Sequence, residues 1–361
     1  MYFSLLKRRQ VKGDELANAT AHILLQVVAR SKWQDVDQLL SRVQNTGSKL
    51  AQAAPQEPVI GNVVRRVLGL IRDEATEDRN ADEFGSESVS DISALPTSVP
   101  TRPGPTPVAR APTFPAAAPA VSKSMFNLLS VAEGLHSPLT VSSTPLSQAV
   151  ATSVPALRSE VIDGIEEIMD EISQADDQIA TFAEVQIHPG DYVLAYMPSR
   201  TVERFLVKAA QKRRFTVLLA SLDSHDRAGE APYAALRKKL GSFGVNTISL
   251  ASHGLMAYMP RVNKVIFGAK AVYLNGGLLV DSGCCIAARA AHEYSKPVIV
   301  LGGVYKFCPQ DPSEEASIFE QGNSSGSVSY ADGPAVDAVE VENTVAEYLP
   351  PDFVDIYLTN L

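Results

Sequence analysis

The sequence predicts an α/β protein in which an N-terminal helical domain is followed by a Rossmann-like domain with a parallel sheet. Two observations support this fold class. Residues 4–75 place apolar side chains at helical spacing, and from residue 192 onward short apolar runs alternate with helix-compatible segments. Residues 264–306 show the alternation best, because an apolar run, a helical segment without proline and a second apolar run follow one another as in a βαβ unit.

The helical domain is predicted from four amphipathic segments. Three of them precede residue 76; the second begins at Trp33 and is predicted to end at Gly47, and the third begins near Pro58. The fourth follows Pro155, and its apolar residues lie on one face of a helix: Leu157, Val161, Ile165, Ile168 and Ile172. Its remaining face is acidic, which is typical of a solvated helix and also suits a basic partner.

Residues 76–122 interrupt the helical pattern and are rich in proline, serine and alanine. Such a segment buries too little apolar surface to offset the entropy of ordering it, so we expect a disordered insertion. The helical domain then comprises residues 1–75 and 123–182, and the α/β domain residues 183–361. The last residues still have a strand-like apolar pattern, so we expect the natural chain to continue past Leu361.

The α/β domain is predicted to contain strands at residues 192–196, 215–221, 246–250, 265–269 and 297–301. Helical patterns fill the intervals between them at residues 199–212, 231–240 and 284–294. Strands that are joined through helices lie parallel and are connected by right-handed crossovers. In such sheets ligands bind outside the carboxyl ends of the strands, and this edge is therefore the place to look for a site.

Composition and charge exclude several functional classes. The formal net charge of −9 over 361 residues argues against direct nucleic-acid contact, because phosphate binding needs a basic surface. The three cysteines form neither a disulfide framework nor a zinc-binding spacing. The chain has no signal peptide and no apolar run of about eighteen residues, no dinucleotide-binding glycine motif and no P-loop. We therefore expect a cytosolic protein with no membrane contact, no metal and no cofactor.

The clearest candidate for a ligand site lies where the first predicted strand ends. Ser199 can cap the following helix, and Arg200 and Thr201 lie beside the free N–H groups of its first turn, where anions bind. Lys270 follows the fourth predicted strand and would reach the same edge of the sheet. Together these four residues predict a crevice for an anion or phosphate. The alternative is an ordinary helix cap in which Arg200 pairs with an acidic neighbour such as Glu203.

Cys284 and Cys285 follow Gly283 at the predicted start of a helix. A thiolate at that position can be activated, although small residues that pack against a sheet are the commoner role. Proton chemistry at the end of the fourth strand would need an acid, and Lys270 stands there instead. We therefore assign no catalytic residue.

Four segments together resemble the beta-type regulatory subunits of eukaryotic translation initiation factor 2B, a guanine-nucleotide exchange factor. The segments are LLKRRQVKG, SRTVERFLVKAAQKRRFTVLLA, RVNKVIFGAKAVYLNGGLL and KPVIVLGGVYK. The resemblance covers nearly the whole chain outside residues 76–122, and the combination of segments is specific.

This resemblance implies a non-catalytic regulatory and scaffold subunit. In that family the beta subunit pairs with its delta paralogue, and with the alpha, gamma and epsilon subunits it forms a two-fold decamer. The alpha, beta and delta subunits sense phosphorylation of the alpha chain of the substrate initiation factor, which carries the initiator tRNA. Nucleotide exchange is catalysed by epsilon, with gamma beside it.

The same fold family includes the methylthioribose-phosphate and ribose-bisphosphate isomerases, which leaves a second hypothesis open. In those enzymes an acidic catalytic residue follows the VIFGA position, and a catalytic cysteine lies upstream. Here Lys270 occupies the first position and no cysteine precedes Cys284, so the resemblance implies that the isomerase machinery is absent. The alternative function is a sugar-phosphate isomerase, or a module that senses a sugar phosphate, with Arg200 and Lys270 on the phosphate.

Overall fold

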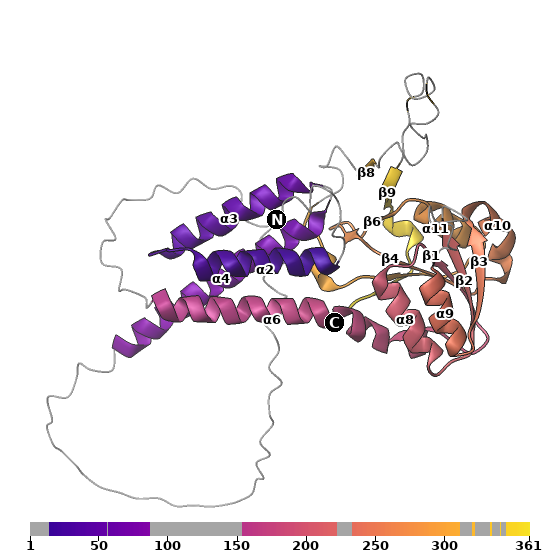
Figure 1. Cartoon of the computed structure of the whole chain (residues 1–361), viewed down its shortest axis with the longest axis horizontal. Coiled ribbons are helices and arrows are strands. Elements are labelled where there is room, and N and C mark those ends of the chain that lie inside the picture. The colour runs from indigo at the N-terminus through magenta and orange to yellow at the C-terminus, as the bar shows by residue number, and fades with distance from the viewer. Residues whose placement is uncertain are drawn as a thin grey trace, which may run out of the picture.

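The structure, a computed structural model, describes residues 14–55, 57–86, 154–221, 233–310, 320–321 and 344–361 together with Gly333 and Glu340. These residues form an elongated bundle of long helices and a layered domain in which helices cover a parallel sheet (Figure 1). The predicted fold class is confirmed. Within the described residues, no helix combines the length and the apolar character that are needed to cross a lipid bilayer.

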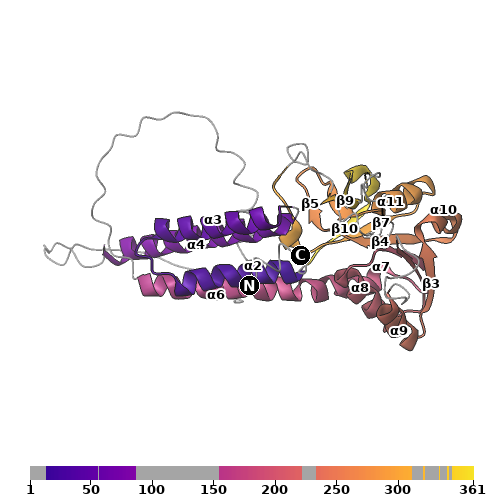
Figure 2. The same ribbon diagram turned by 45° about the horizontal axis from the view of Figure 1, so that its top comes forward.

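The bundle consists of long helices that lie side by side and point away from the sheet domain (Figure 2). They are α2 (Asp14–Arg30), α3 (Val36–Ala53), α4 (Pro58–Ser86) and α6 (Val154–Thr181). The apolar stripe predicted for α6 is buried along its whole length and packs into one core with α2, α3 and α4. Arg66 of α4 forms an ion pair with Glu171 on α6, so the acidic face of α6 is partly used within the bundle.

Three ends of the bundle helices differ from the prediction, and the first is the start of α3, which lies at Val36 and not at Trp33. Gly47 does not end the second helix, because α3 continues to Ala53. Gly47 lies instead at the closest approach of α3 and α4, where a Cβ would lie 2.5 Å from Cγ1 of Val64. The third helix, α4, continues to Ser86 and thus extends past the predicted start of the insertion at residue 76. The rest of the predicted insertion and residues 123–153 lie outside the described residues.

The main sheet has the strand order β10-β7-β4-β1-β2-β3, and all of its pairings are parallel. Its strands are β1 (Tyr192–Tyr196), β2 (Thr216–Ser221), β3 (Asn246–Ala251), β4 (Lys264–Gly268), β7 (Val298–Leu301) and β10 (Ile356–Leu358). The first five coincide with the predicted strands to within one residue at each end. The sixth, β10, pairs with β7 and uses the apolar pattern near the end of the chain.

Alternate side chains of β1 enter two different cores. Val193 and Ala195 pack with α7, α8 and α9, whereas Leu194 and Tyr196 pack with α10 and α11. This alternation is expected for a strand that is covered on both faces. The covering helices are α7 (Ala183–Gln186), α8 (Arg200–Ala210), α9 (Ala234–Ser242), α10 (Leu255–Tyr258) and α11 (Cys284–Glu293).

A small antiparallel sheet, which the sequence did not predict, lies beside the main one in the order β5-β6-β9-β8. Its strands are β5 (Ala271–Val272), β6 (Leu278–Asp281), β9 (Thr344–Leu349) and β8 (Glu320–Gln321). The turn between β5 and β6 contains Asn275-Gly276-Gly277, and Gly276 has the positive φ of +82° that favours glycine. Very short strands lack the period-two pattern that would reveal them in a sequence.

Two polar contacts hold the bundle and the sheet domain at fixed positions. Asn62 of α4 donates from Nδ2 to the backbone oxygen of Tyr305 at 3.1 Å. Thr201 of α8 donates to Asp176 of α6, as described below. Both Asn62 and Asp176 are buried, so each contact satisfies a polar group that would otherwise destabilise the interior.

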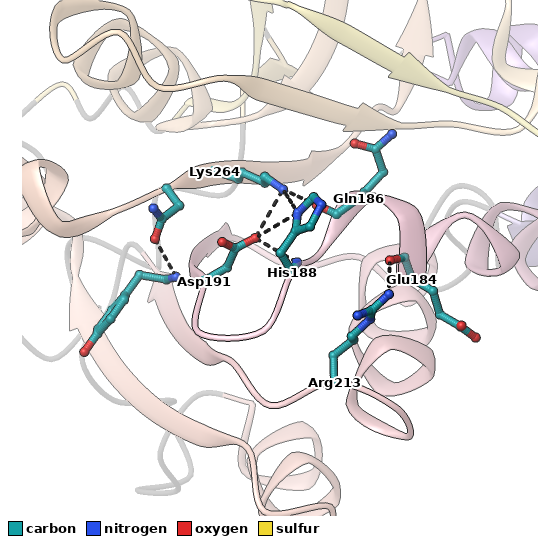
Figure 3. A network of polar contacts seen from close by, with 8 residues as sticks. Glu184, Gln186, His188, Asp191, Arg213 and Lys264 are labelled. Carbon is teal, nitrogen blue, oxygen red and sulfur yellow. Dashed lines mark hydrogen bonds and ion pairs between the residues drawn. The ribbon is translucent and has the colours of Figure 1, made fainter.

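A polar network stabilises the amino-terminal edge of the sheet, where β1 and β4 begin (Figure 3). Lys264, the first residue of β4, donates to the backbone oxygen of Gln186, contacts Nδ1 of His188 at 2.9 Å and lies 3.1 Å from the Asp191 carboxylate. The same carboxylate accepts the backbone N–H of His188 at 2.9 Å. The segment after α7 is therefore tied to β4 before β1 starts.

The close approach of α3 and α4 predicts different effects for two glycine-to-alanine substitutions. In Gly47→Ala the new methyl group meets the stiff side chain of Val64, and such overpacking costs about 1–3 kcal/mol. Gly69 of α4 is the matched control, because a Cβ there meets nothing within 4 Å and alanine favours the helix by about 1 kcal/mol. We expect chemical denaturation to rank Gly69→Ala above the wild type and Gly47→Ala below Gly69→Ala. Equal unfolding midpoints of the two variants would contradict the packing.

Candidate functional site at the carboxyl edge of the sheet

The predicted Ser199 cap is present at the carboxyl end of β1. Ser199 has extended backbone angles (φ −73°, ψ 170°), and its Oγ accepts the N–H of Val202 at 3.5 Å. Gly268, the last residue of β4, permits this arrangement, because a Cβ at that position would lie 2.4 Å from Ser199 Oγ. The start of α8 and the end of β4 therefore meet at one edge of the sheet.

Arg200 is the exposed cation of this edge. Its side chain is 57% exposed, and its Nη1 lies 4.0 Å from Oε1 of Glu15, which is itself 70% exposed. Its acidic neighbour is thus Glu15 on α2 and not Glu203. An exposed pair of this kind contributes about 0–1 kcal/mol, so Arg200 can exchange Glu15 for another anion at little cost.

Thr201 has a different role, because its side chain is buried. Its hydroxyl donates to Oδ1 of Asp176 at 2.7 Å, and Asp176 is also buried. Arg204 adds to the same contact, since its Nη1 lies 3.9 Å from Asp176 and 3.0 Å from Asp177. Thr201 therefore joins α8 to the last turns of α6.

Lys270 is paired within the chain. Its Nζ lies 3.0 Å from Oδ1 of Asp281, and both side chains are about one quarter exposed, at 25% and 29%. Its backbone N–H donates to the oxygen of Leu279 at 2.9 Å, which attaches the segment after β4 to β6. A phosphate that bound Lys270 would have to compete with Asp281.

The start of α11 is occupied by a carboxylate of the chain itself. Oε1 of Glu347, on β9, accepts the N–H of Cys285 at 2.8 Å. Burial, followed by the charge of Glu347 and the hydrogen bond to it, raises the pKa of the Cys285 thiol to about 12. Burial and the charge of Asp281 raise the pKa of the Cys284 thiol as well. Both thiols therefore stay protonated near neutral pH, which disfavours nucleophilic chemistry.

Tyr196, the last residue of β1, brings a hydroxyl to the same place. It is fully buried, and within the described residues its hydroxyl has no hydrogen-bond partner. Gly283 makes room for it, since a Cβ at residue 283 would lie 1.9 Å from the hydroxyl oxygen. Burial is the largest cause that raises the pKa of Tyr196, so this group stays neutral.

Among the residues that the structure describes, the edge therefore combines the exposed Arg200 with several groups that are already paired. Among the described residues, no cluster of three or more histidine, cysteine, aspartate or glutamate side chains suits a metal ion. The anion site at Ser199, Arg200, Thr201 and Lys270 stays a prediction. Sequence reasoning missed Asp281 and Glu347. Asp281 has a recognisable local pattern, because it ends an apolar run just before Ser282-Gly283. Glu347 has no such pattern.

The contact between Thr201 and Asp176 predicts a specific loss of stability. Thr201→Val keeps the shape of the side chain and removes the donor to a buried carboxylate, which costs about 1–3 kcal/mol of unfolding free energy. Thr46→Val is the matched control, because the exposed Thr46 hydroxyl only donates to the Arg42 oxygen within α3. We expect urea denaturation to separate the two variants, and equal midpoints would contradict a stabilising role for the contact.

The raised pKa of Cys285 predicts a loss of stability at alkaline pH. The folded chain holds the thiol proton more tightly than the unfolded chain, whose thiol titrates near its ordinary value of 9.0. The stabilising contribution is thus fully present below about pH 9 and is lost as the pH rises towards about 12. We expect thermal unfolding midpoints to fall more steeply above pH 9 for the wild type than for Cys285→Ser. Parallel pH profiles of the two proteins would show that folding does not raise the pKa of the Cys285 thiol.

Comparisons with known proteins agree with this architecture over the whole chain. The family model described as "Initiation factor 2 subunit family" matches residues 10–361. Translation initiation factor eIF2B subunit beta of Schizosaccharomyces pombe is 34% identical over 362 residues, which cover 99% of this chain and 89% of the relative.

Solved structures extend the similarity. The crystal structure of eIF2B beta from Chaetomium thermophilum is 54% identical with a TM-score of 0.65, and the match covers 99% of this chain and 83% of that one. A chain of the tetrameric eIF2B-beta2-delta2 complex from C. thermophilum is 55% identical with a TM-score of 0.68, with 99% and 87% covered. The predicted resemblance is confirmed: the chain belongs to the initiation factor 2 subunit family, and the relatives that it matches along its length at 34% and 54% identity are eIF2B beta subunits.

Proposed function

We propose that the chain acts as a beta-type regulatory and scaffold subunit of the guanine-nucleotide exchange factor eIF2B. The observation that carries this proposal is similarity along 99% of the chain to relatives named eIF2B subunit beta. The matched region includes both the helical bundle and the sheet domain. The chain therefore resembles these relatives in both of its parts and not in one domain alone.

The partners proposed for this chain are the other subunits of the exchange factor. One solved relative is a tetrameric complex of two beta and two delta subunits, which supports pairing of this chain with a delta paralogue. The fuller proposal adds alpha, gamma and epsilon in a two-fold decamer, with exchange catalysed outside this chain. In that assembly the chain would help to sense the phosphorylated alpha chain of the substrate factor, in the cytosol and without touching nucleic acid.

Two exposed apolar side chains on neighbouring helices of the sheet domain are compatible with subunit contact. Met256 on α10 is 50% exposed and Ile286 on α11 is 57% exposed, and α10 and α11 pack against each other. Another subunit that covered these helices would remove both side chains from water, which favours binding.

The carboxyl edge favours this function over a sugar-phosphate isomerase. Lys270 is paired with Asp281, and the thiols of Cys284 and Cys285 are held in the protonated form. An isomerase would need a free acid or base and a nucleophile or phosphate-binding group in one crevice. We therefore do not favour the isomerase or the sugar-phosphate sensor as the function.

The proposal is tested by native mass spectrometry after co-expression with delta and gamma subunits, beside the chain alone. We expect a stoichiometric complex only when the partners are present, and a chain that associates poorly by itself. A symmetric homodimer that ignores both partners would overturn the proposal. Turnover of pentose phosphates by the purified chain would overturn it independently.

A further inference from the structure

A basic surface lies on the outer side of α8 and α9, the helices that cover one face of the main sheet. Figure 1 shows these two helices side by side in the sheet domain, with α8 next to the end of α6, and α8 and α9 are in contact. The cations of this surface are Lys208, Lys212, Arg214, Arg237, Lys238 and Lys239, and all of them are exposed or half-buried. We call it the α8–α9 basic face.

The cations of the α8–α9 basic face are only partly neutralised. Lys212 pairs with Glu184 at 2.8 Å, and Arg214 donates to the backbone oxygen of Gly244 at 3.1 Å. In the part of the chain that the structure describes, the remaining four cations have no carboxylate within ion-pair distance. The nearby carboxyl of Glu203 has a pKa that burial raises, and the charge of Lys239 only partly offsets this.

Helix dipoles explain some of these cations and not all. A lysine in the last turn of a helix is stabilised by the partial negative charge of the free carbonyl groups, and Lys208 and Lys239 occupy such positions. Arg237 and Lys238 lie earlier in α9, and Arg214 lies beyond the end of α8. The surface therefore carries more positive charge than its two helix ends require.

The rest of the described chain makes this face unusual. The formal net charge is −9, and the exposed acids of α6 are placed on the bundle. Unpaired cations that are concentrated on one face of an acidic protein attract a locally acidic partner, and they orient it, because the remainder of the molecule repels it.

We propose that the α8–α9 basic face binds an acidic polypeptide segment, rich in aspartate and glutamate, of a partner protein. Clusters of lysine and arginine recognise acidic motifs through charge-assisted hydrogen bonds. Phe243, 37% exposed at the end of α9, can pack against an apolar residue of the segment. An RNA partner is less suited, since RNA-binding surfaces generally present several aromatic side chains for base stacking.

The test measures binding of a fluorescently labelled poly-glutamate peptide to the full chain by anisotropy at low salt. The variant Lys238→Gln/Lys239→Gln removes two cations of the face, and loss of two exposed ion pairs weakens binding about two- to thirtyfold. The matched control Lys32→Gln/Arg42→Gln removes the same charge from exposed positions on the bundle and should bind like the wild type. Because the chain is tested alone, the result does not depend on whether the proposed subunit assembly forms.

Three results would overturn the proposal. The first is equal weakening in both variants, which would mean that only net charge matters. The second is tighter binding of labelled poly-uridylate with the same dependence on Lys238 and Lys239, which would make the face an RNA site. The third is no measurable binding of poly-glutamate to the wild-type chain. Circular dichroism of both variants checks that each is folded.

Discussion

The buried contact between Asp176 and Thr201 is the interaction on which the relation of the two parts depends. Helix α6 fills the bundle core with its apolar stripe, and its last turns carry Asp176 to the start of α8. A carboxylate in the interior is tolerated only when donors compensate for its lost hydration. The hydroxyl of Thr201 supplies such a donor, so the end of the bundle and the carboxyl edge of the sheet are stabilised together.

The same need for compensation determines the chemistry of the carboxyl edge. In open parallel sheets this edge is the usual place for ligands. Here Asp281 pairs with Lys270, and Glu347 on the small sheet accepts the N–H of Cys285 in the first turn of α11. At Lys270 and at the start of α11 the chain thus supplies its own carboxylates where a ligand could otherwise bind, and the protonated thiols remain as packing groups.

Charge is distributed unevenly over the described surface. Exposed acids follow α6 on the bundle, among them Glu160, Asp163 and Asp170, whereas cations gather on α8 and α9. Figures 1 and 2 place these helices in different parts of the molecule. A partner with an uneven charge distribution would therefore approach in one preferred orientation, because the electrostatic fields of the two proteins act before they touch. Added salt screens these fields and weakens the preference.

The sequence by itself determined the helices of the bundle, five strands of the main sheet and their parallel direction, because the period of the apolar residues is a local property that distinguishes a helix from a strand. The positions of Ser199 as a cap and of the strands near residues 192 and 265 followed from it. Only the tertiary structure decided the partners of the site residues. Thr201 meets Asp176, and Lys270 meets Asp281, while Gly47 serves a helix contact instead of a helix end. These contacts depend on which segments, far apart in the sequence, the fold brings together. The spacing of residues within one segment does not say which other segment it will meet.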